Sequence, residues 1–337
     1  MSQNILEVEN LSVGIPVPTG TLHAVQGINF SVKRGETLCI VGESGCGKSI
    51  TALSLMNLLP KAAKRSADRI VLDGTDIRSF DESQMSDLRG DRMAMIFQEP
   101  MTSLNPAYTI GNQLEEAMLR HRNVSQAEAR DRAVFLLEKV GITGARGRLG
   151  QYPHQLSGGL RQRVMIAMSL MCDPALILAD EPTTALDVTI QAQILHLLAE
   201  LRHEFDTSLI LITHDLGIVA RVADRVAVMY AGEFVETGTA DQVFNAPSHP
   251  YTQGLLNCIP VPGKTKRGAH LGAIPGIVPS LVGDMEGCHF ASRCPYVHSA
   301  CESGKIELQP SRVKTHEYRC ILTPAQTAKN QKKGFAA

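Results

Sequence analysis

The sequence has no excess of charge, no long apolar run and no leader-like start, and each absence excludes a class of protein. Its 33 Lys and Arg nearly balance its 34 Asp and Glu, for a formal charge of −1, which argues against a broad nucleic-acid-binding surface. Residues 1–4 lack the basic and apolar regions of a signal peptide. The longest uncharged stretch near the end, residues 268–283, is broken by glycines and prolines and cannot span a bilayer as a helix. We therefore expect a soluble protein that is not exported.

The length predicts one large core with an appendage. At 337 residues the chain exceeds the usual size of a single domain, and its 44% of hydrophobic residues is ordinary for a globular protein. Short apolar segments alternate with helical ones, which predicts an α/β fold with a mainly parallel sheet covered on both faces. Beyond Thr239 glycine and proline become frequent, so we place a domain boundary near residues 245–260.

The expected elements follow from periodicity and turn residues. Strands are expected at residues 5–8, 24–32, 37–41, 69–72, 93–97, 175–179, 208–213 and 225–229, with a loop at 16–20. Helices are expected at residues 49–59, 110–140, 157–171, 188–204 and 251–258.

A glycine-rich segment follows the strand expected at residues 37–41. Glycines let the backbone curl so that successive N–H groups point at phosphate oxygens, and the start of the next helix adds its positive dipole end. Lys48 would bind the β- and γ-phosphates, and the Ser49 hydroxyl would ligate Mg²⁺. The segment predicts a nucleoside triphosphate site that consists of Gly42, Glu43, Ser44, Gly45, Cys46, Gly47, Lys48, Ser49 and Ile50.

Cys46 lies inside this segment, and its thiol allows two interpretations. It can be a small residue tolerated at a variable position. It can also be a thiolate stabilised by Lys48 and the helix terminus, which would make the site sensitive to thiol reagents.

Two acidic residues end the strand expected at residues 175–179. Asp180, at the carboxyl end of that strand, can hold Mg²⁺ opposite Ser49. Glu181 comes next and can accept a proton from the water that attacks the γ-phosphate. Alternatively, the two carboxylates only cap a turn, but downstream of a phosphate-binding loop the catalytic interpretation is favoured.

A second helix start suited to anions is predicted at Ser157, Gly158 and Gly159. One nucleotide does not need two such helix ends from one chain, so this one would serve the nucleotide of a partner subunit. A simple flexible helix cap is the alternative, but it does not explain why the element lies shortly before Asp180.

With these three elements in this order, the chain resembles the ATP-binding cassette (ABC) family over about residues 5–245. The resemblance implies an ABC-type P-loop ATPase with a mainly parallel core sheet, an antiparallel β subdomain and a helical subdomain at about residues 100–172. Gln98 matches the family's lid glutamine, Asp187 matches the loop at the dimer interface, and His214 matches the switch histidine at the γ-phosphate.

The resemblance also assigns roles within the site. It implies that ATP is the nucleotide, that the catalytic residues are Glu181, His214 and Gln98, and that the Mg²⁺ ligands are Ser49, Gln98 and Asp180. Two positions depart from the family. Ile15 stands where an aromatic residue usually stacks on adenine, and Leu160 stands where many members have glutamine.

Three segments, residues 41–45, 97–106 and 248–252, resemble the ATPase subunits of dipeptide and oligopeptide importers. The resemblance implies a peripheral protein at the cytoplasmic face of the inner membrane. Its partners would be two integral-membrane permease subunits and a periplasmic or extracellular solute-binding protein. A second ABC ATPase subunit would pair with it, either a non-identical chain or a second copy of this one. No nucleic acid is expected as a partner. The alternatives are import of nickel, an opine or a sugar, an exporter ATPase, a soluble ABC ATPase, and a non-enzymatic nucleotide switch.

The C-terminal extension expected at residues 246–326, followed by a flexible tail at 327–337, contains four clustered cysteines. Cys288, Cys294, Cys301 and Cys320 suggest a metal site before disulfides in a reducing cytosol, and their wide spacing is looser than that of most zinc sites. Four thiolates can hold a [4Fe–4S] cluster. The resemblance to importer subunits that carry such a cluster favours it here. Zn²⁺ and unliganded thiols remain alternatives.

Overall fold

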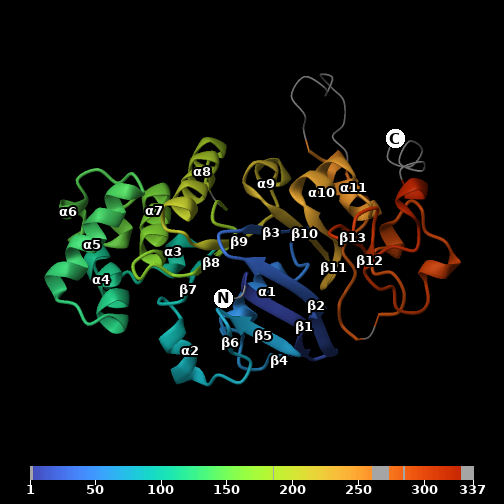
Figure 1. Ribbon diagram of the computed structural model, residues 1–337, viewed down its shortest axis with the longest axis horizontal. Coiled ribbons are helices and arrows are strands. Elements are labelled where there is room, and N and C mark those ends of the chain that lie inside the picture. Colours follow the sequence, from blue (N-terminus) through green and yellow to red (C-terminus); the bar gives the residue numbers. More distant parts are fainter. Residues whose placement is uncertain (1–2, 185, 260–272, 284, 328–337) are drawn as a thin grey trace. The chain divides into compact units, whose positions relative to one another are not determined.

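The computed structural model describes residues 3–184, 186–259, 273–283 and 285–327 (Figure 1). The chain forms two compact units, and each is built from separate stretches of sequence. Unit one comprises residues 1–7, 31–37 and 70–212, and unit two comprises residues 8–30, 38–69 and 213–337. The part of the tail at 328–337 lies outside the described residues.

Unit one contains three parallel strands. Strand β8 (Leu176–Asp180) pairs with β7 (Met93–Ile96) on one side and with β9 (Ser208–Thr213) on the other. Every residue of β8 is buried, because four apolar side chains precede Asp180. The remaining elements that lie wholly or mostly in unit one are β5 (Arg69–Leu72), β6 (Thr75–Asp76), α2 (Glu82–Leu88), α3 (Pro100–Ser103), α4 (Ile110–His121), α5 (Gln126–Lys139), α6 (Ala145–Arg148), η1 (Pro153–Gln155), α7 (Gly158–Ser169) and α8 (Val188–Glu204).

Four helices of unit one, α3, α4, α5 and α8, contact α7 (Figure 1). Residues 110–140, predicted to be predominantly helical, contain two helices, α4 and α5. Ser125 ends the connection, because its hydroxyl accepts a hydrogen bond from the Glu128 N–H while the Glu128 carboxylate accepts one from the Ser125 N–H. This reciprocal cap starts α5 as a new helix.

Unit two contains both parallel and antiparallel strand pairs. Strand β10 (Arg225–Tyr230) is parallel to β3 (Thr37–Val41) and antiparallel to β11 (Glu233–Thr239). The other elements that lie wholly or mostly in unit two are β1 (Asn4–Val17), β2 (Gly20–Lys33), α1 (Lys48–Leu55), β4 (Lys64–Ser66), α9 (Leu216–Val222), α10 (Ala240–Asn245), α11 (Pro250–Asn257), η2 (Ala291–Arg293), η3 (Ser299–Cys301), β12 (Gln309–Pro310) and β13 (Glu317–Tyr318). Strands β1 and β2 are much longer than predicted, and the loop expected at residues 16–20 shrinks to Pro18 and Thr19.

The C-terminal segment is attached to the sheet of unit two by one buried carboxylate. Strand β13 pairs with β11, and Glu236 of β11 is fully buried. Its carboxylate accepts hydrogen bonds from the N–H groups of Ser248 (2.7 Å) and His249 (2.9 Å) and lies 2.7 Å from His316 Nε2. Glu236 thus binds residues 248–249 and residue 316, and so connects two distant parts of the C-terminal segment to β11.

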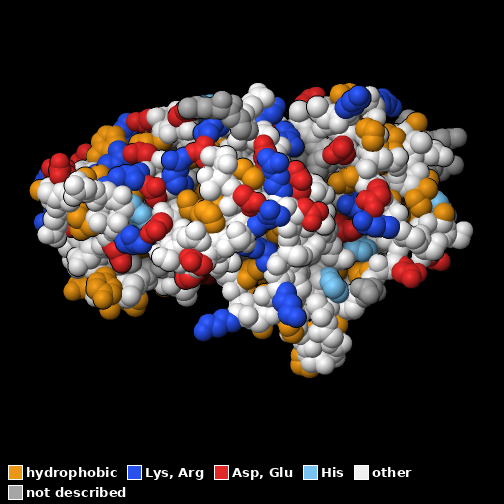
Figure 2. Space-filling model, turned by 60° about the horizontal axis from the view of Figure 1, so that its bottom comes forward, with side chains coloured by type: hydrophobic (Ala, Val, Ile, Leu, Met, Phe, Trp, Pro, Cys, Tyr) orange, Lys and Arg blue, Asp and Glu red, His pale blue; other side chains and the backbone are white. Residues whose placement is uncertain are grey.

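The distribution of charge on the surface agrees with the composition. On the face shown in Figure 2, basic and acidic side chains are interspersed, in agreement with a formal charge of −1. Within the described residues, no helix combines the length and the apolar character needed to cross a bilayer.

Candidate functional site: a phosphate loop and a carboxylate pair

The phosphate loop of unit two runs from the end of β3 into α1, and two of its glycines are required by close backbone contacts. A Cβ atom on Gly42 would lie 2.1 Å from the Met229 carbonyl oxygen, and one on Gly47 would lie 2.3 Å from that of Ala24. Gly47 also has a φ of 108°, which side-chain-bearing residues rarely adopt. The backbone of β10 and β2 therefore fixes the shape of the loop.

Lys48 is inside this loop and is 4% exposed. Its Nζ donates hydrogen bonds to the carbonyl oxygens of Gly42 and Glu43, both at 2.9 Å. The ammonium group is thus held at the centre of the loop by groups that a phosphate oxygen can replace. Ser44 and Gly45 at the tip are exposed, while Ser49 and Ile50 are half-buried in the first turn of α1.

The interpretation of Cys46 as a reactive thiolate is not supported. Cys46 is fully buried, and this burial raises the pKa of its thiol, although Lys48 acts in the opposite direction. A neutral, inaccessible thiol fits the alternative, a small side chain tolerated within the loop.

In unit one the structure brings together two of the predicted catalytic residues. The Gln98 side-chain amide donates a hydrogen bond to Glu181 Oε2 at 3.0 Å. Thr184 Oγ1 donates to the same oxygen at 2.9 Å. The neighbouring Asp180 is 5% exposed at the end of β8. The carboxylate of Glu181 is therefore oriented by two neutral donors.

The backbone at Glu181 is also specific. Its φ of 44° is left-handed, which costs a residue with a side chain about 1–2 kcal/mol. The Glu181 N–H donates to the Ile212 carbonyl oxygen at 2.9 Å, and this bond to β9 holds the turn in place. Sequence reasoning missed Thr184, whose only signal is a hydroxyl three residues after the acid in an expected turn.

The segment predicted to act on a partner's nucleotide begins a regular twelve-residue helix, α7. Ser157 is its N-cap, with the hydroxyl accepting from the Leu160 N–H at 3.4 Å, and both Ser157 and Gly158 are exposed. A Cβ atom on Gly158 would lie 3.8 Å from the Leu186 side chain, and one on Gly159 would lie 3.5 Å from that of Ile190, so the helix start lies next to the segment that contains Asp187. Asp187 is exposed and is the N-cap of α8.

His214 belongs to unit two, directly after β9. Its side chain is exposed, and the next residue, Asp215, caps α9 by accepting hydrogen bonds from the N–H groups of Gly217 (2.9 Å) and Ile218 (3.3 Å). This cap fixes the backbone beside His214.

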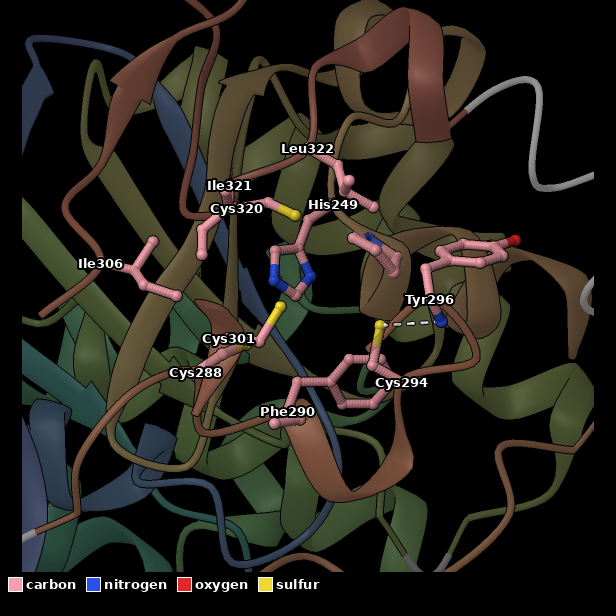
Figure 3. A pocket seen from close by; sticks show the side chains of 12 residues that line it. His249, Cys288, Phe290, Cys294, Tyr296, Cys301, Ile306, Cys320, Ile321 and Leu322 are labelled. Carbon is pink, nitrogen blue, oxygen red and sulfur yellow. Dashed lines mark hydrogen bonds between the residues drawn. The ribbon is translucent and has the colours of Figure 1, made fainter. Parts of the chain in front are cut away.

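The predicted [4Fe–4S] cluster is wrong. Cys288, Cys294, Cys301 and Cys320 do line one cavity of unit two, but it measures about 10 Å³, the space of a single water (Figure 3). No group of three or more His, Cys, Asp or Glu side chains among the described residues could hold a metal ion, so zinc has no support either.

The physical reason is the apolar character of the cavity. Phe290, Ile306 and Leu322 line it with the four cysteines (Figure 3). Burial raises the pKa of Cys294 to about 12 and that of Cys320 to about 11. Metals bind thiolates, and a site that disfavours the thiolate disfavours the metal.

Comparisons with known proteins identify the family. The family model described as ABC transporter matches residues 25–184, and the one described as oligopeptide/dipeptide transporter, C-terminal region, matches residues 235–301. The dipeptide transport ATP-binding protein DppD of Bacillus subtilis is 51% identical over 95% of both chains. The oligopeptide transport ATP-binding protein AppD of Bacillus subtilis is 49% identical over 94% of this chain and 96% of its own.

Solved structures give the same result at lower identity. The ATP-binding cassette MJ0796, in a dimeric post-hydrolysis state bound to ADP and Pi, matches with a TM-score of 0.63 and 27% identity over 70% of this chain and 98% of its own. CbiO1 from Clostridium perfringens matches with a TM-score of 0.61 and 30% identity over 72% of this chain and 92% of its own. The chain belongs to the ABC transporter family, as one of its ATP-hydrolysing subunits.

Proposed function

We propose that this chain is the ATPase subunit of an importer for dipeptides or oligopeptides. The observation that carries the proposal is its identity of about one half, over nearly the whole length of both chains, to relatives named for dipeptide and oligopeptide transport. The match to the C-terminal region of such transporters at residues 235–301 supports the same substrate class, because that region lies outside the nucleotide-binding segment.

We propose the following roles in ATP binding. The N–H groups of the phosphate loop and the start of α1 bind the triphosphate, and Lys48 exchanges its two carbonyl acceptors for β- and γ-phosphate oxygens. The oxygen donors of Ser49, Gln98 and Asp180 suit Mg²⁺, which prefers oxygen ligands. When bound, Mg²⁺ neutralises charge on the β- and γ-phosphates.

Glu181 would act as general base. Water attacks the γ-phosphorus, its proton passes to the Glu181 carboxylate, and the bond to the leaving β-phosphate oxygen breaks, which releases ADP and phosphate. Gln98 and Thr184 orient the carboxylate through the hydrogen bonds they donate to Oε2. His214 would contact the γ-phosphate.

The exposed helix start at Ser157, Gly158 and Gly159, with Asp187, would complete the nucleotide site of a second ABC ATPase subunit. ATP then favours the closed pair, and hydrolysis removes the contacts that stabilise closure. The chain would act at the cytoplasmic face of the membrane with two permease subunits and a solute-binding protein.

The test is uptake of labelled dipeptides and tripeptides by cells that lack this chain. The wild-type chain is expected to restore uptake, and Glu181→Gln is expected not to. Restoration of nickel, opine or sugar uptake without peptide uptake would contradict the peptide assignment. Failure to co-purify with integral-membrane subunits would contradict the transport function altogether.

A further inference from the structure

Glu43, inside the phosphate loop, is held by residues more than 200 positions later in the chain. The Arg293 guanidinium donates two hydrogen bonds to its carboxylate, from Nη1 to Oε2 at 2.5 Å and from Nη2 to Oε1 at 2.9 Å. The Glu43 N–H donates to the Tyr251 hydroxyl at 2.9 Å. Both the side chain and the backbone of this loop residue are therefore bound by the C-terminal segment.

Arg293 is itself fixed. Its side chain is 3% exposed. Nε donates to the Pro275 carbonyl oxygen at 3.0 Å and Nη2 to that of Ile274 at 3.2 Å, while Nη1 lies 3.4 Å from the Tyr230 hydroxyl. A guanidinium with this many fixed partners has one geometry, and its fork matches a carboxylate.

Aromatic packing makes this support rigid. The rings of Tyr230, Tyr251 and Phe290 are fully buried, and their centroids lie 4.6 to 5.4 Å apart. Phe290 lies three residues before Arg293, and Tyr251 lies in the first turn of α11. The aromatic cluster thus joins both residues that hold Glu43.

The charge at Glu43 matters because the loop receives a polyanion. The Glu43 carbonyl oxygen accepts from Lys48 Nζ, so this residue lies next to the cation that would bind phosphate. A carboxylate here without a counter-charge would repel the triphosphate, and removal of Arg293 would leave the half-buried Glu43 carboxylate uncompensated. Arg293 supplies that counter-charge.

We propose that Arg293 is a positioning residue for nucleoside triphosphate binding. Through Glu43 it neutralises the one carboxylate of the phosphate loop and holds the loop in the shape that accepts the triphosphate. The C-terminal segment is then a determinant of ATP affinity. This inference rests on the ATPase function and adds a residue to its nucleotide site.

The test compares four forms of the full chain: wild type, Arg293→Gln, Glu43→Gln and the double variant. We expect Arg293→Gln to weaken ATP binding about tenfold and to raise KM with little change in kcat. The double variant is expected to regain most of the lost affinity, because it no longer carries an uncompensated carboxylate. The loss should be largest for ATP, smaller for ADP and smallest for AMP.

A matched control separates this role from a general contribution to folding. Arg319 is another buried arginine of the same segment, but its guanidinium donates to the carbonyl oxygens of Phe234 and Ile306 and pairs with Glu233 at 3.5 Å, outside the phosphate loop. Arg319→Gln is expected to lower the melting temperature without changing ATP affinity. If Arg293→Gln does not fold, Arg293→Lys keeps the charge and loses the fork, and a two- to threefold weaker affinity is expected.

The outcomes are distinct. If the wild type does not bind ATP, the ATPase assignment itself fails. If the wild type binds ATP and either Arg293 variant that folds binds equally well, the inference is overturned. It is also overturned if the double variant binds as weakly as Arg293→Gln, or if AMP, ADP and ATP lose affinity equally.

Discussion

Two carboxylates of the proposed nucleotide site, Glu181 in unit one and Glu43 in unit two, are held in opposite ways. Glu181 is oriented by neutral groups, from Thr184 in its own turn and from Gln98 after the neighbouring strand β7. Glu43 is bound by a buried cation and a tyrosine hydroxyl from the far end of the chain. The Gln98 amide and the Thr184 hydroxyl orient the Glu181 carboxylate without adding a charge of their own, whereas the Arg293 guanidinium places a positive charge beside Glu43.

The difference teaches that the chemical step and nucleotide binding depend on separate parts of the sequence. Changes at Glu181 should alter hydrolysis and leave affinity nearly unchanged. Changes in the C-terminal segment should alter affinity and stability and leave the chemical step nearly unchanged. Three substitutions test this separation.

The largest effect is expected for Glu181→Gln. Loss of a general base lowers a rate by about 10² to 10⁴-fold, and the neutral amide leaves the shape of the site intact. Phosphate release should fall by this factor, while ATP affinity should change by less than about threefold, which is under 1 kcal/mol. Measurement of both quantities on one sample checks the separation.

A matched control is Glu138→Gln on the exposed surface of α5, which should hydrolyse ATP at the wild-type rate. Full hydrolysis by Glu181→Gln would remove the role of general base from this residue. A parallel loss of ATP affinity would show that unit one also determines binding.

The next effect concerns His249, which begins α11 and is fully buried. Burial lowers the pKa of its imidazole to about 3, with a further contribution from Arg319. In the unfolded chain the pKa of this imidazole is about 6.5. As the pH falls below about 6.5, the unfolded state therefore binds a proton that the folded state does not bind. The stability that His249 contributes is complete above pH 6.5 and is lost as the pH falls towards 3, by about 1.4 kcal/mol per pH unit.

His249→Asn should reduce this acid sensitivity. The imidazole Nδ1 accepts a hydrogen bond from the Tyr251 N–H at 3.0 Å, and an asparagine oxygen can cap the helix in the same way without titrating. Between pH 6.5 and 5, urea unfolding of the wild type should lose about 2 kcal/mol more than that of the variant. His196→Asn, at an exposed position, should behave like the wild type. Parallel pH curves for His249→Asn and wild type would contradict the assignment.

Elements that are marked by residues close together in the sequence could be predicted from it. The glycine-rich loop before Lys48 and the apolar run before Asp180 are both visible in the sequence, although the contacts that require Gly42 and Gly47 come from Met229 and Ala24. The break before α5 had a signal too, Ser125 followed by Glu128, which the periodicity of residues 110–140 concealed. The extent of β1 and β2 had no such marker, because their alternation of buried and exposed residues is irregular.

Contacts between distant residues could not be predicted in the same way. Nothing near Glu43 in the sequence indicates Arg293, because an ion pair across 250 positions depends on the completed fold. For the four cysteines the error was the opposite one, because their clustering in the sequence predicted a shared metal cluster that the structure does not support. Spacing does not fix the surroundings of the sulfur atoms, and the apolar side chains that line their cavity favour neutral thiols.

The smallest effect is expected for Tyr251→Phe, which removes only the hydroxyl that accepts from the Glu43 N–H. A donor left without its acceptor costs about 1–3 kcal/mol when buried, and we expect the low end because Glu43 is only half-buried. Tyr108→Phe, at a position 55% exposed, should change nothing. ATP affinity should fall less in Tyr251→Phe than in Arg293→Gln, because the ion pair to the Glu43 carboxylate remains. A larger loss in Tyr251→Phe would mean that the backbone contact, and not the neutralised charge, is what prepares the loop for the triphosphate.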